Sequence, residues 1–369
     1  MSAVVSALRR CGDRAALISL PVPKRRSNYQ AAFVSRQDGF PACFLASHGN
    51  PFVRKLITCV SLFFFVWRAV RPGDRVLLYN HAIEYAPALL LLRALRVPVY
   101  HDIEDVPTMH ERGLRGAINK ASFEFVYRLT SVRKVTASNQ IARELRLKNF
   151  KAVQGIFTTE ALRSSRLDKW QQLQRGGALR VHFGGTLSPA TGTDVFCDAI
   201  LQLSMSVKNS SLREIVFVVT GVGDLDRIKH LSEYVRSPRV RIEVYPAVSR
   251  AQYLDLLDSC HGSLSLKSPS SEISRTTFPS KVVEITSRGL SLVATRISDV
   301  VHIFDENMVW FLTHFSGEAL CEILEEMSEN PDEVRRRADL GRARSEANFS
   351  SNAVGTELSK FLRSDSADK

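Results

Sequence analysis

The order of apolar segments constrains the fold of this chain more than any other feature of its sequence. Short apolar runs, each long enough for one strand, alternate along most of the 369 residues with stretches of helical length. Apolar strands that are separated by helices form parallel sheets with helices on both faces. The predicted strands are residues 15–20, 75–80, 97–102, 134–138, 151–155, 179–185, 214–221, 240–246, 262–267, 290–295 and 308–313.

The pattern lapses in the polar segment 164–177, which ends in two glycines before a new strand begins. The chain is also too long for one ordinary domain. We therefore expect two doubly wound α/β domains in tandem, facing a cleft, with an N-terminal domain over 1–165 and a C-terminal domain over 178–340. Residues 341–369 are predicted to form closing helices and a polar tail.

The charge of the chain indicates its possible binding partners, and its cysteine content indicates the redox state of its compartment. Fifty Lys and Arg against 38 Asp and Glu give a net charge of +12. Solvated surface charge explains this excess, and so does contact with anionic lipid, nucleic acid or phosphorylated small molecules. The six cysteines have no paired spacing, which argues against a disulfide framework or a zinc site and favours a reducing cytosol.

The most apolar segment, residues 56–70, is shorter than the roughly 20 residues that span a bilayer. Basic residues flank it at Arg54, Lys55 and Arg71. Two interpretations stay open, a helix buried in the protein and a helix that lies in a membrane surface. The N-terminus has basic residues where a signal peptide needs an apolar core, so we expect no signal peptide.

Glycine-rich turns follow two of the predicted strands, at Gly185 and at Gly221. Sheets of this kind bind ligands beyond the carboxyl ends of their strands, where backbone N–H groups are free. Tight turning alone would explain either turn. A third segment places Lys281 and Glu284 at the start of a helix, where the simpler interpretation is a helical ion pair.

The order of these segments along the chain is typical of a known family. The succession "FGGTL", "VTGVGDLDRI", "VYPAVSRAQYLDLLDSC" and "FPSKVVEITSRGLSLVATRISDV" resembles the donor-binding half of GT-B glycosyltransferases. It is most similar to the large retaining group known as family four, and the resemblance covers about residues 178–350. The first domain is similar more loosely. The motif residues that the chain keeps are Pro279, Ser280, Lys281, Glu284, Gly289, Val293, Ala294 and Thr295.

The resemblance implies a site for a nucleotide-sugar donor, with no other cofactor and no metal. Glu284 would accept hydrogen bonds from the ribose hydroxyls, and the turn 278–280 would present its backbone to the donor. The other donor-binding residues that it implies are Gly185, Thr186, Gly221, Lys267, Thr277, Phe278, Pro279, Ser280 and Lys281.

The chain departs from the family pattern at several site positions. Thr276 stands where many members have a first Glu, and Glu272 is close but out of register. Thr186 and Thr191 stand where basic residues hold the diphosphate. The nearest cations that could neutralise a diphosphate are then Lys267, Arg275 and Lys281.

A further departure lies at the N-terminus, where residues 1–20 resemble the first helix and the second strand of the family's N-terminal domain. The first strand and its Gly-rich loop are therefore expected to be missing. Either the start codon is placed late or the domain has lost an element. A sheet without a central strand leaves backbone groups unpaired, which favours the late start.

One histidine is a candidate for the chemistry. His101, followed by Asp102, Glu104 and Asp105, is expected at the end of a strand and facing the cleft. By resemblance it would lie next to the transferred sugar, where an imidazole binds a hydroxyl or relays a proton. A structural role for His101 is the alternative, and His81 is a rival candidate.

The sequence therefore predicts a glycosyltransferase that moves a hexose-like sugar from a nucleotide-sugar to a glycan or lipid-linked acceptor in polysaccharide biosynthesis, with retention. The alternatives are a nucleotide-sugar epimerase of the same shape and a degenerate member that binds without turnover. The expected location is the cytoplasm, with peripheral contact at the inner face of a membrane and no nucleic-acid partner. That contact is inferred from basic clusters at 24–26, 54–55, Arg93 and Arg96.

Overall fold

A computed structural model describes residues 1–19, 29–37, 39–107, 113–157, 166–205, 213–246, 248–271, 274 and 278–364. The chain divides into two compact units. Unit 1 comprises Met1–Thr158 and Ser350–Lys369, and unit 2 comprises Thr159–Phe349. Among the described residues, no helix is long and apolar enough to cross a lipid bilayer.

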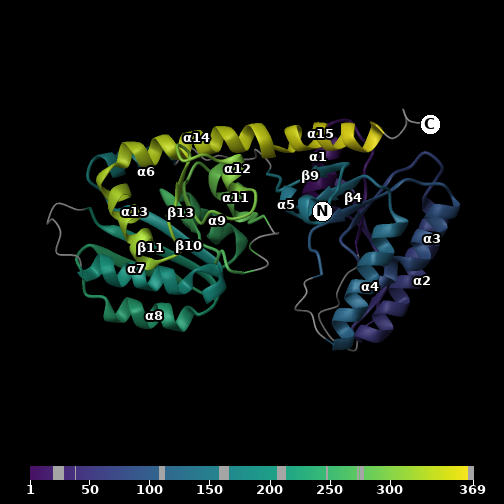
Figure 1. Cartoon of the computed structure of the whole chain (residues 1–369), viewed down its shortest axis with the longest axis horizontal. Coiled ribbons are helices and arrows are strands. Elements are labelled where there is room, and N and C mark those ends of the chain that lie inside the picture. The colour runs from purple at the N-terminus through teal and green to yellow at the C-terminus, as the bar shows by residue number, and fades with distance from the viewer. Residues whose placement is uncertain are drawn as a thin grey trace. The chain divides into compact units, whose positions relative to one another are not determined.

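Unit 2 is built on a six-stranded sheet in which every neighbouring pair is parallel (Figure 1). All six strands predicted for the second half of the sequence are present. Their order β12-β11-β10-β13-β14-β15 reverses between β10 and β13, so that the loops after these strands converge. The strands are β10 (Leu179–Leu187), β11 (Ile215–Gly223), β12 (Val240–Tyr245), β13 (Gly262–Ser265), β14 (Ser291–Ala294) and β15 (Val309–Phe311).

Helices cover both faces of this sheet, as its apolar strands require. In Figure 1, α7 and α8 lie along one face, and α11, α12 and α14 lie along the other. The helices are α6 (Arg166–Gln174), α7 (Thr193–Met205), α8 (Leu225–Tyr234), α9 (Arg250–Asp258), α11 (Lys281–Ser287), α12 (Val300–Ile303), α13 (Gly317–Glu329) and α14 (Pro331–Phe349), with a short 3-10 helix η2 (Pro189–Thr191).

The sheet of unit 1 is interrupted. Four parallel strands form the order β6-β7-β8-β9, and β1-β4-β3 and β2-β5 form separate small sheets. The antiparallel hairpin β3–β4 was not among the predicted strands. The strands are β1 (Leu17–Ser19), β2 (Tyr29–Gln30), β3 (Phe33–Gln37), β4 (Phe40–Phe44), β5 (Ser47–His48), β6 (Val76–Tyr79), β7 (Val99–Ile103), β8 (Lys134–Thr136) and β9 (Phe150–Ala152).

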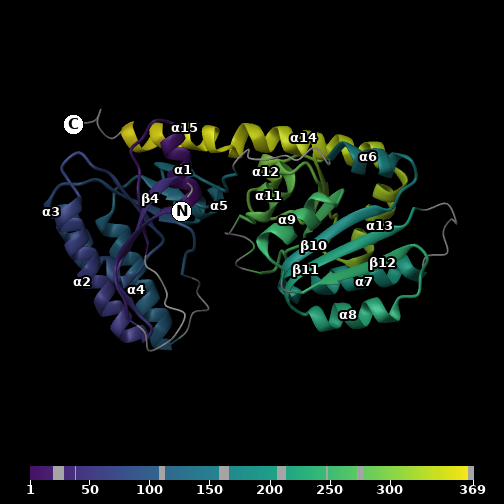
Figure 2. The same cartoon turned by 180° about the vertical axis from the view of Figure 1, so that it is seen from behind.

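The C-terminal helix α15 (Ser351–Arg363) packs in unit 1 against the N-terminal helix α1 (Ser2–Arg10), side by side with it in Figure 2. Leu358 and Leu362 share a core cluster with Val4 and Leu8. The described part of the segment 341–369, predicted as closing helices and a polar tail, is thus divided between α14 in unit 2 and α15 in unit 1. The other helices of unit 1 are α2 (Pro51–Ala69), η1 (Ile83–Tyr85), α3 (Ala86–Ala94), α4 (Gly113–Leu129) and α5 (Asn139–Glu144).

The apolar segment 56–70 forms most of α2, and this helix is buried on only one side. Asn50 caps it by accepting hydrogen bonds from the backbone of Phe52 and Val53, and Thr58, Leu62 and Val66 are buried. A second stripe of large apolar side chains is exposed, with exposed fractions of 49–73%. This stripe comprises Phe52, Leu56, Val60, Phe64 and Trp67, and interpretation as a fully buried helix is therefore wrong.

Two helical glycines offer a matched test of the α1–α15 contact. A Cβ at Gly355 would lie 2.7 Å from the carbonyl carbon of Ala7, whereas a Cβ at Gly341 in α14 meets nothing closer than 3.5 Å. We expect Gly355→Ala to lower the free energy of unfolding by about 1–3 kcal/mol, the cost of overpacking. The matched Gly341→Ala should raise it by up to about 1 kcal/mol through helix propensity.

Urea denaturation of both variants checks this expectation. Equal stabilisation by the two substitutions would show that α15 does not pack closely on α1.

Candidate functional site

Near their carboxyl ends, β10 and β11 pair at two glycines that the sequence had placed in turns after these strands. Gly185 and Gly221 are paired across the two strands, with φ of +107° and +134°. A Cβ at Gly221 would lie 2.8 Å from the backbone N of Gly185, and a Cβ at Gly185 would lie 2.7 Å from Cε of Lys281. Both positions therefore require glycine, for conformation and for space.

Lys281 begins α11, and its ammonium donates a hydrogen bond to the carbonyl oxygen of Gly184. Burial lowers the pKa of Lys281, the charge of Glu284 raises it, and the charge of Lys267 lowers it again. The ammonium of Lys281 thus lies against the glycine end of β10, and the charge of Lys267 acts on it. Two such cations, with backbone N–H groups nearby, are suited to an anion.

Glu284 lies one turn further along α11 and is held by a residue that the sequence prediction missed. The hydroxyl of Tyr253, on α9, donates to Oε2 of Glu284 over 3.0 Å. Burial raises the pKa of Tyr253, and the charge of Glu284 raises it further, so that Tyr253 stays a donor. A carboxylate has about four acceptor positions, so Glu284 can accept further hydrogen bonds beside that from Tyr253.

A buried histidine joins β10 to its two neighbouring strands close to these glycines. His182 on β10 makes hydrogen bonds of 2.9 Å to Oγ of Ser263 and of 2.9 Å to Oγ1 of Thr220. Its ring lies 5.7 Å from that of Tyr253, edge to face. Burial lowers the pKa of His182 to about 3, and the charge of Lys281 acts in the same direction. A neutral His182 thus ties three strands together. A polar residue inside an apolar run was the signal for it.

Thr186 is exposed to solvent, whereas the hydroxyl of Thr191 is hydrogen-bonded within a turn. Oγ1 of Thr191 donates to the carbonyl of Thr186 over 2.6 Å and accepts from the backbone N of Ser188 over 2.9 Å. Thr191 therefore fixes the turn that follows β10, where the family pattern has a cation.

The turn before α11 is anchored in the core. Phe278 and Pro279 are buried, and the ring of Phe278 lies 6.2 Å from that of Phe349. Ser280 is exposed at the start of the helix. The backbone N of Lys267, just after β13, donates to Oγ1 of Thr295 over 3.2 Å. Four residues that the sequence singled out lie outside the described residues: Glu272, Arg275, Thr276 and Thr277.

In unit 1, the position of His101 differs from the prediction. His101 lies in the middle of β7, because this strand runs on to Ile103, and its side chain has no exposed surface. Burial lowers the pKa of His101 to about 3, and the charges of Lys134 and His81 lower it too. The rival His81 follows the end of β6 and is only partly buried, with Nε2 2.9 Å from Oδ1 of Asn119.

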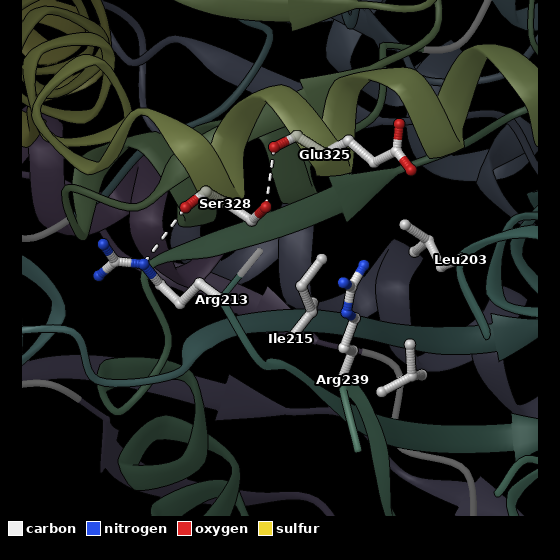
Figure 3. A pocket seen from close by; sticks show the side chains of 7 residues that line it. Leu203, Arg213, Ile215, Arg239, Glu325 and Ser328 are labelled. Carbon is white, nitrogen blue, oxygen red and sulfur yellow. Dashed lines mark hydrogen bonds between the residues drawn. The ribbon is translucent and has the colours of Figure 1, made fainter. Parts of the chain in front are cut away.

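Other cavities and clusters of the described residues do not add to this site. Figure 3 shows a hollow of about 10 Å³ in unit 2, where Arg213 donates to the carbonyl of Ser328 over 3.2 Å. That volume suits at most a single water. Within the described part of the chain, no three His, Cys, Asp or Glu residues are grouped so as to hold a metal.

Comparison with known proteins identifies the class. Residues 205–359 match the family described as "Glycosyl transferase-like". No curated protein sequence matches the chain.

Solved structures share its fold over almost the whole length. Sucrose-phosphate synthase from Thermosynechococcus elongatus has a TM-score of 0.72 at 13% identity, over 99% of this chain and 92% of that one. A glycosyltransferase from Rickettsia africae has a TM-score of 0.70 at 15% identity, over 100% and 94%. Anabaena HepE in complex with UDP and glucose has a TM-score of 0.65 at 13% identity, over 98% and 95%.

The fold is therefore the GT-B arrangement of two Rossmann-like domains, and the family match lies mainly in unit 2. The match over residues 205–359 and the shared fold support a transferase of the glycosyltransferase class.

The buried His182 makes the stability of unit 2 depend on pH. A histidine titrates near 6.5 in an unfolded chain and His182 near 3 in the folded one. Above pH 6.5 the imidazole is neutral in both states, and between about 6.5 and 3 only the unfolded chain gains a proton. The free energy of unfolding should therefore fall with falling pH, by up to about 1.4 kcal/mol per pH unit from this group.

We expect His182→Gln to show a shallower loss of stability than the parent in urea titrations from pH 7 to 4.5. His314→Gln, at an exposed position of the same unit, is the matched control and should keep the parental slope. If His182→Gln keeps the parental slope too, His182 does not fold as a neutral, buried group.

Proposed function

We propose that this glycosyltransferase binds a nucleoside diphosphate sugar at the carboxyl edge of the unit 2 sheet and transfers the sugar with retention. The observation that carries the proposal is the grouping of Glu284, Tyr253 and Lys281 around the Gly185–Gly221 loops. This group supplies a carboxylate, a cation and the backbone of two glycines, which a ligand can approach closely, within one short stretch of the sheet edge.

Each part of the donor has a matching group. Glu284, oriented by Tyr253, accepts hydrogen bonds from the ribose hydroxyls, since it retains acceptor positions. The diphosphate lies against the backbone at Gly185 and Gly221, with Thr186, Lys281 and Lys267 beside it. The turn made by Phe278, Pro279 and Ser280 borders the sugar.

The reaction needs little from side chains beyond binding and orientation. The donor phosphate takes the proton of the acceptor hydroxyl, the new glycosidic bond forms, and the bond to phosphate breaks. Neither a metal nor a further cofactor is part of the proposal. His81 replaces the buried His101 as the candidate to bond a sugar hydroxyl in unit 1. Its ring nitrogens lie 3.0 Å from Oδ1 of Asn80 and 2.9 Å from Oδ1 of Asn119, so the sugar hydroxyl would take the place of one of these partners.

The solved neighbours support a nucleotide-sugar donor. HepE structures contain UDP, UDP with glucose, and UDP-glucose. Sucrose-phosphate synthase and trehalose-6-phosphate synthase are named as synthases of glycosidic products, so the epimerase interpretation is not favoured. The acceptor we propose is a glycan or lipid-linked saccharide of polysaccharide biosynthesis.

The donor site is tested by calorimetric titration with a panel of nucleotide-sugars that includes UDP-glucose. Glu284→Ala should weaken binding by about 1–3 kcal/mol, because a charged hydrogen-bond partner of the ribose is lost. Tyr253→Phe should weaken it less, since only the orientation of Glu284 is relaxed. Glu326→Ala, at an exposed position of α13, is the matched control and should bind as the parent does.

Unchanged affinity in folded Glu284→Ala would place the ribose elsewhere. Binding of a donor without transfer to any acceptor would support the non-catalytic alternative.

We further propose that α2 attaches the protein to the cytoplasmic face of an anionic membrane. Its exposed stripe from Phe52 to Trp67 follows one face of the helix, and Arg68 and Arg71 are exposed beside its end. A helix with such a face lies in the membrane interface, and basic residues add about 1 kcal/mol each near an anionic surface. Arg93 and Arg96 on and after α3 are exposed as well. The basic cluster 24–26 lies outside the described residues.

Vesicle co-sedimentation tests the membrane contact. Binding should increase with the fraction of anionic lipid and decrease in high salt, because the charges are screened. Phe64→Ser combined with Trp67→Ser should reduce binding at least tenfold, whereas Tyr234→Ser, which removes an exposed aromatic ring from unit 2, should not. Equal recovery of the parent with neutral and anionic vesicles would contradict the proposal.

A further inference from the structure

Besides the hydrogen bond from Tyr253 to Glu284, an ion pair joins α9 to α11 in unit 2. In this pair, Nη1 of Arg288 lies 2.6 Å from Oδ1 of Asp258. Asp258 is the last residue of α9, and Arg288 directly follows α11, about one helical turn after Glu284. The hydrogen bond and the ion pair therefore connect the same two helices at neighbouring turns.

Burial and geometry distinguish this ion pair from a surface salt bridge. The side chain of Arg288 is 20% exposed and that of Asp258 is 16% exposed. Fully exposed pairs contribute little, because water and salt screen them. A half-buried guanidinium that donates to a carboxylate at this distance makes a charge-assisted hydrogen bond of defined geometry. The pair thus fixes the spacing between the ends of α9 and α11.

The end of α9 is itself held by α6. The buried ammonium of Lys169 donates to the backbone carbonyl of Asp258 over 3.0 Å and to that of Cys260. A cation at this place is favoured, because the last carbonyls of a helix carry a partial negative charge. Trp170, the neighbour of Lys169, is buried in the core of the unit. Asp258 therefore has a fixed backbone position, and Arg288 is attached to it.

The orientation of α11 depends on contacts of this kind. This helix has seven residues, and an isolated helix of that length is not stable. A hydroxyl contact ties it to α14, where Oγ1 of Thr286 lies 2.5 Å from Oγ of Ser345. Toward α9, the ion pair fixes the end of the helix that carries Glu284. Whether the hydroxyl of Tyr253 reaches the carboxylate depends on that position.

Arg288 also acts on Tyr253 through its charge. Burial raises the pKa of Tyr253, the charge of Glu284 raises it further, and the charge of Arg288 lowers it. The guanidinium therefore lies close enough for its charge to act on the hydroxyl that orients Glu284. The ion pair and the hydrogen bond thus belong to one polar network between α9 and α11.

We propose that Arg288 is a positioning residue of the donor site. Through its ion pair with Asp258, it holds α11 at the spacing from α9 at which Tyr253 orients Glu284 toward the ribose hydroxyls. Arg288 does not touch the donor itself, and the inference rests on the proposed role of Glu284. The alternative is an ion pair that only stabilises unit 2, as a cation at the end of α11 does through the helix dipole.

Calorimetric titration with two nucleotides distinguishes positioning from stability. The probes are the nucleoside diphosphate of the donor that the parent binds most tightly and its dideoxy form, which lacks both ribose hydroxyls. Arg288→Gln should weaken binding of the first by about three- to tenfold, the range for residues coupled through one network. It should leave the affinity for the dideoxy form unchanged, because that form has no hydroxyl for Glu284 to hold.

Two further variants test the same contact. Asp258→Asn, which keeps the shape of the side chain and removes its charge, should act as Arg288→Gln does. Arg288→Lys, which keeps the cation, should recover most of the affinity. In a Tyr253→Phe background, Arg288→Gln should weaken binding by less than about twofold more, because both changes act through Glu284.

Arg180→Gln is the matched control. Arg180 pairs with Glu243 over 2.8 Å in the same unit, at exposed fractions of 25% and 22%. Loss of this pair should lower the stability to urea by an amount similar to the loss in Arg288→Gln. It should leave the binding of both nucleotides as in the parent.

Equal weakening of the two nucleotides by Arg288→Gln, or additive losses in the Tyr253→Phe background, would show a structural role and overturn the inference. Parental affinities in folded Arg288→Gln and Asp258→Asn would overturn it too. Glu284→Ala separates this failure from that of the proposed function. If Glu284→Ala binds both nucleotides as the parent does, both proposals fail. If it weakens binding of the first nucleotide alone and Arg288→Gln does not, only the positioning role fails.

Discussion

Parallel strands have to be covered on both faces, and this constraint determines most of what the molecule does. Most residues of the six strands of unit 2 are buried, so helices occupy both faces of the sheet and leave the strand ends for chemistry. All the strands point the same way, so the loops after β10, β11 and β13 gather at one edge. The glycines, Lys281 and the residues that follow β13 are brought together there without being close in sequence.

At that edge it is costly to bury a polar group without a hydrogen bond, and the polar side chains of the site have hydrogen-bond partners. The ammonium of Lys281 is held by a carbonyl of the glycine loop, and Glu284 is held by the hydroxyl of Tyr253. Beneath them, His182 stays neutral because it is buried, and its two ring nitrogens have hydroxyl partners. The groups proposed to touch the donor are therefore oriented before it binds, which reduces the cost of ordering them. In unit 1, β1 and β6 are the edge strands of two separate sheets, and residues of both line a cavity.

The sequence predicted unit 2 well, because its strands are short segments rich in apolar residues that stand between helical stretches. Glu284 and Lys281 could be predicted as site residues because they stand in a motif. Tyr253 and His182 were missed, since their importance comes from partners 31 and 38 residues or more away. Thr191 was assigned to a phosphate position by its place in the motif, whereas its hydroxyl closes a turn.

Unit 1 was predicted less well, for physical reasons that can be named. His101 was expected at a strand end together with Asp102, Glu104 and Asp105, yet the strand extends past it to Ile103 and buries it. The β3–β4 hairpin was overlooked although Asp38-Gly39, a strong hairpin signal, stands between two apolar runs. The apolar residues of α2 were interpreted by composition alone, while their spacing produces one buried and one exposed face.

A crystal structure of the protein with a nucleoside diphosphate sugar tests the central claim most directly. The account predicts that the ribose hydroxyls lie within hydrogen-bond distance of Glu284, and that the diphosphate lies against Gly185 and Gly221 with the ammonium of Lys281 beside it. Density for the nucleotide at any other edge of the sheet, with Glu284 bonded only to Tyr253, would contradict it.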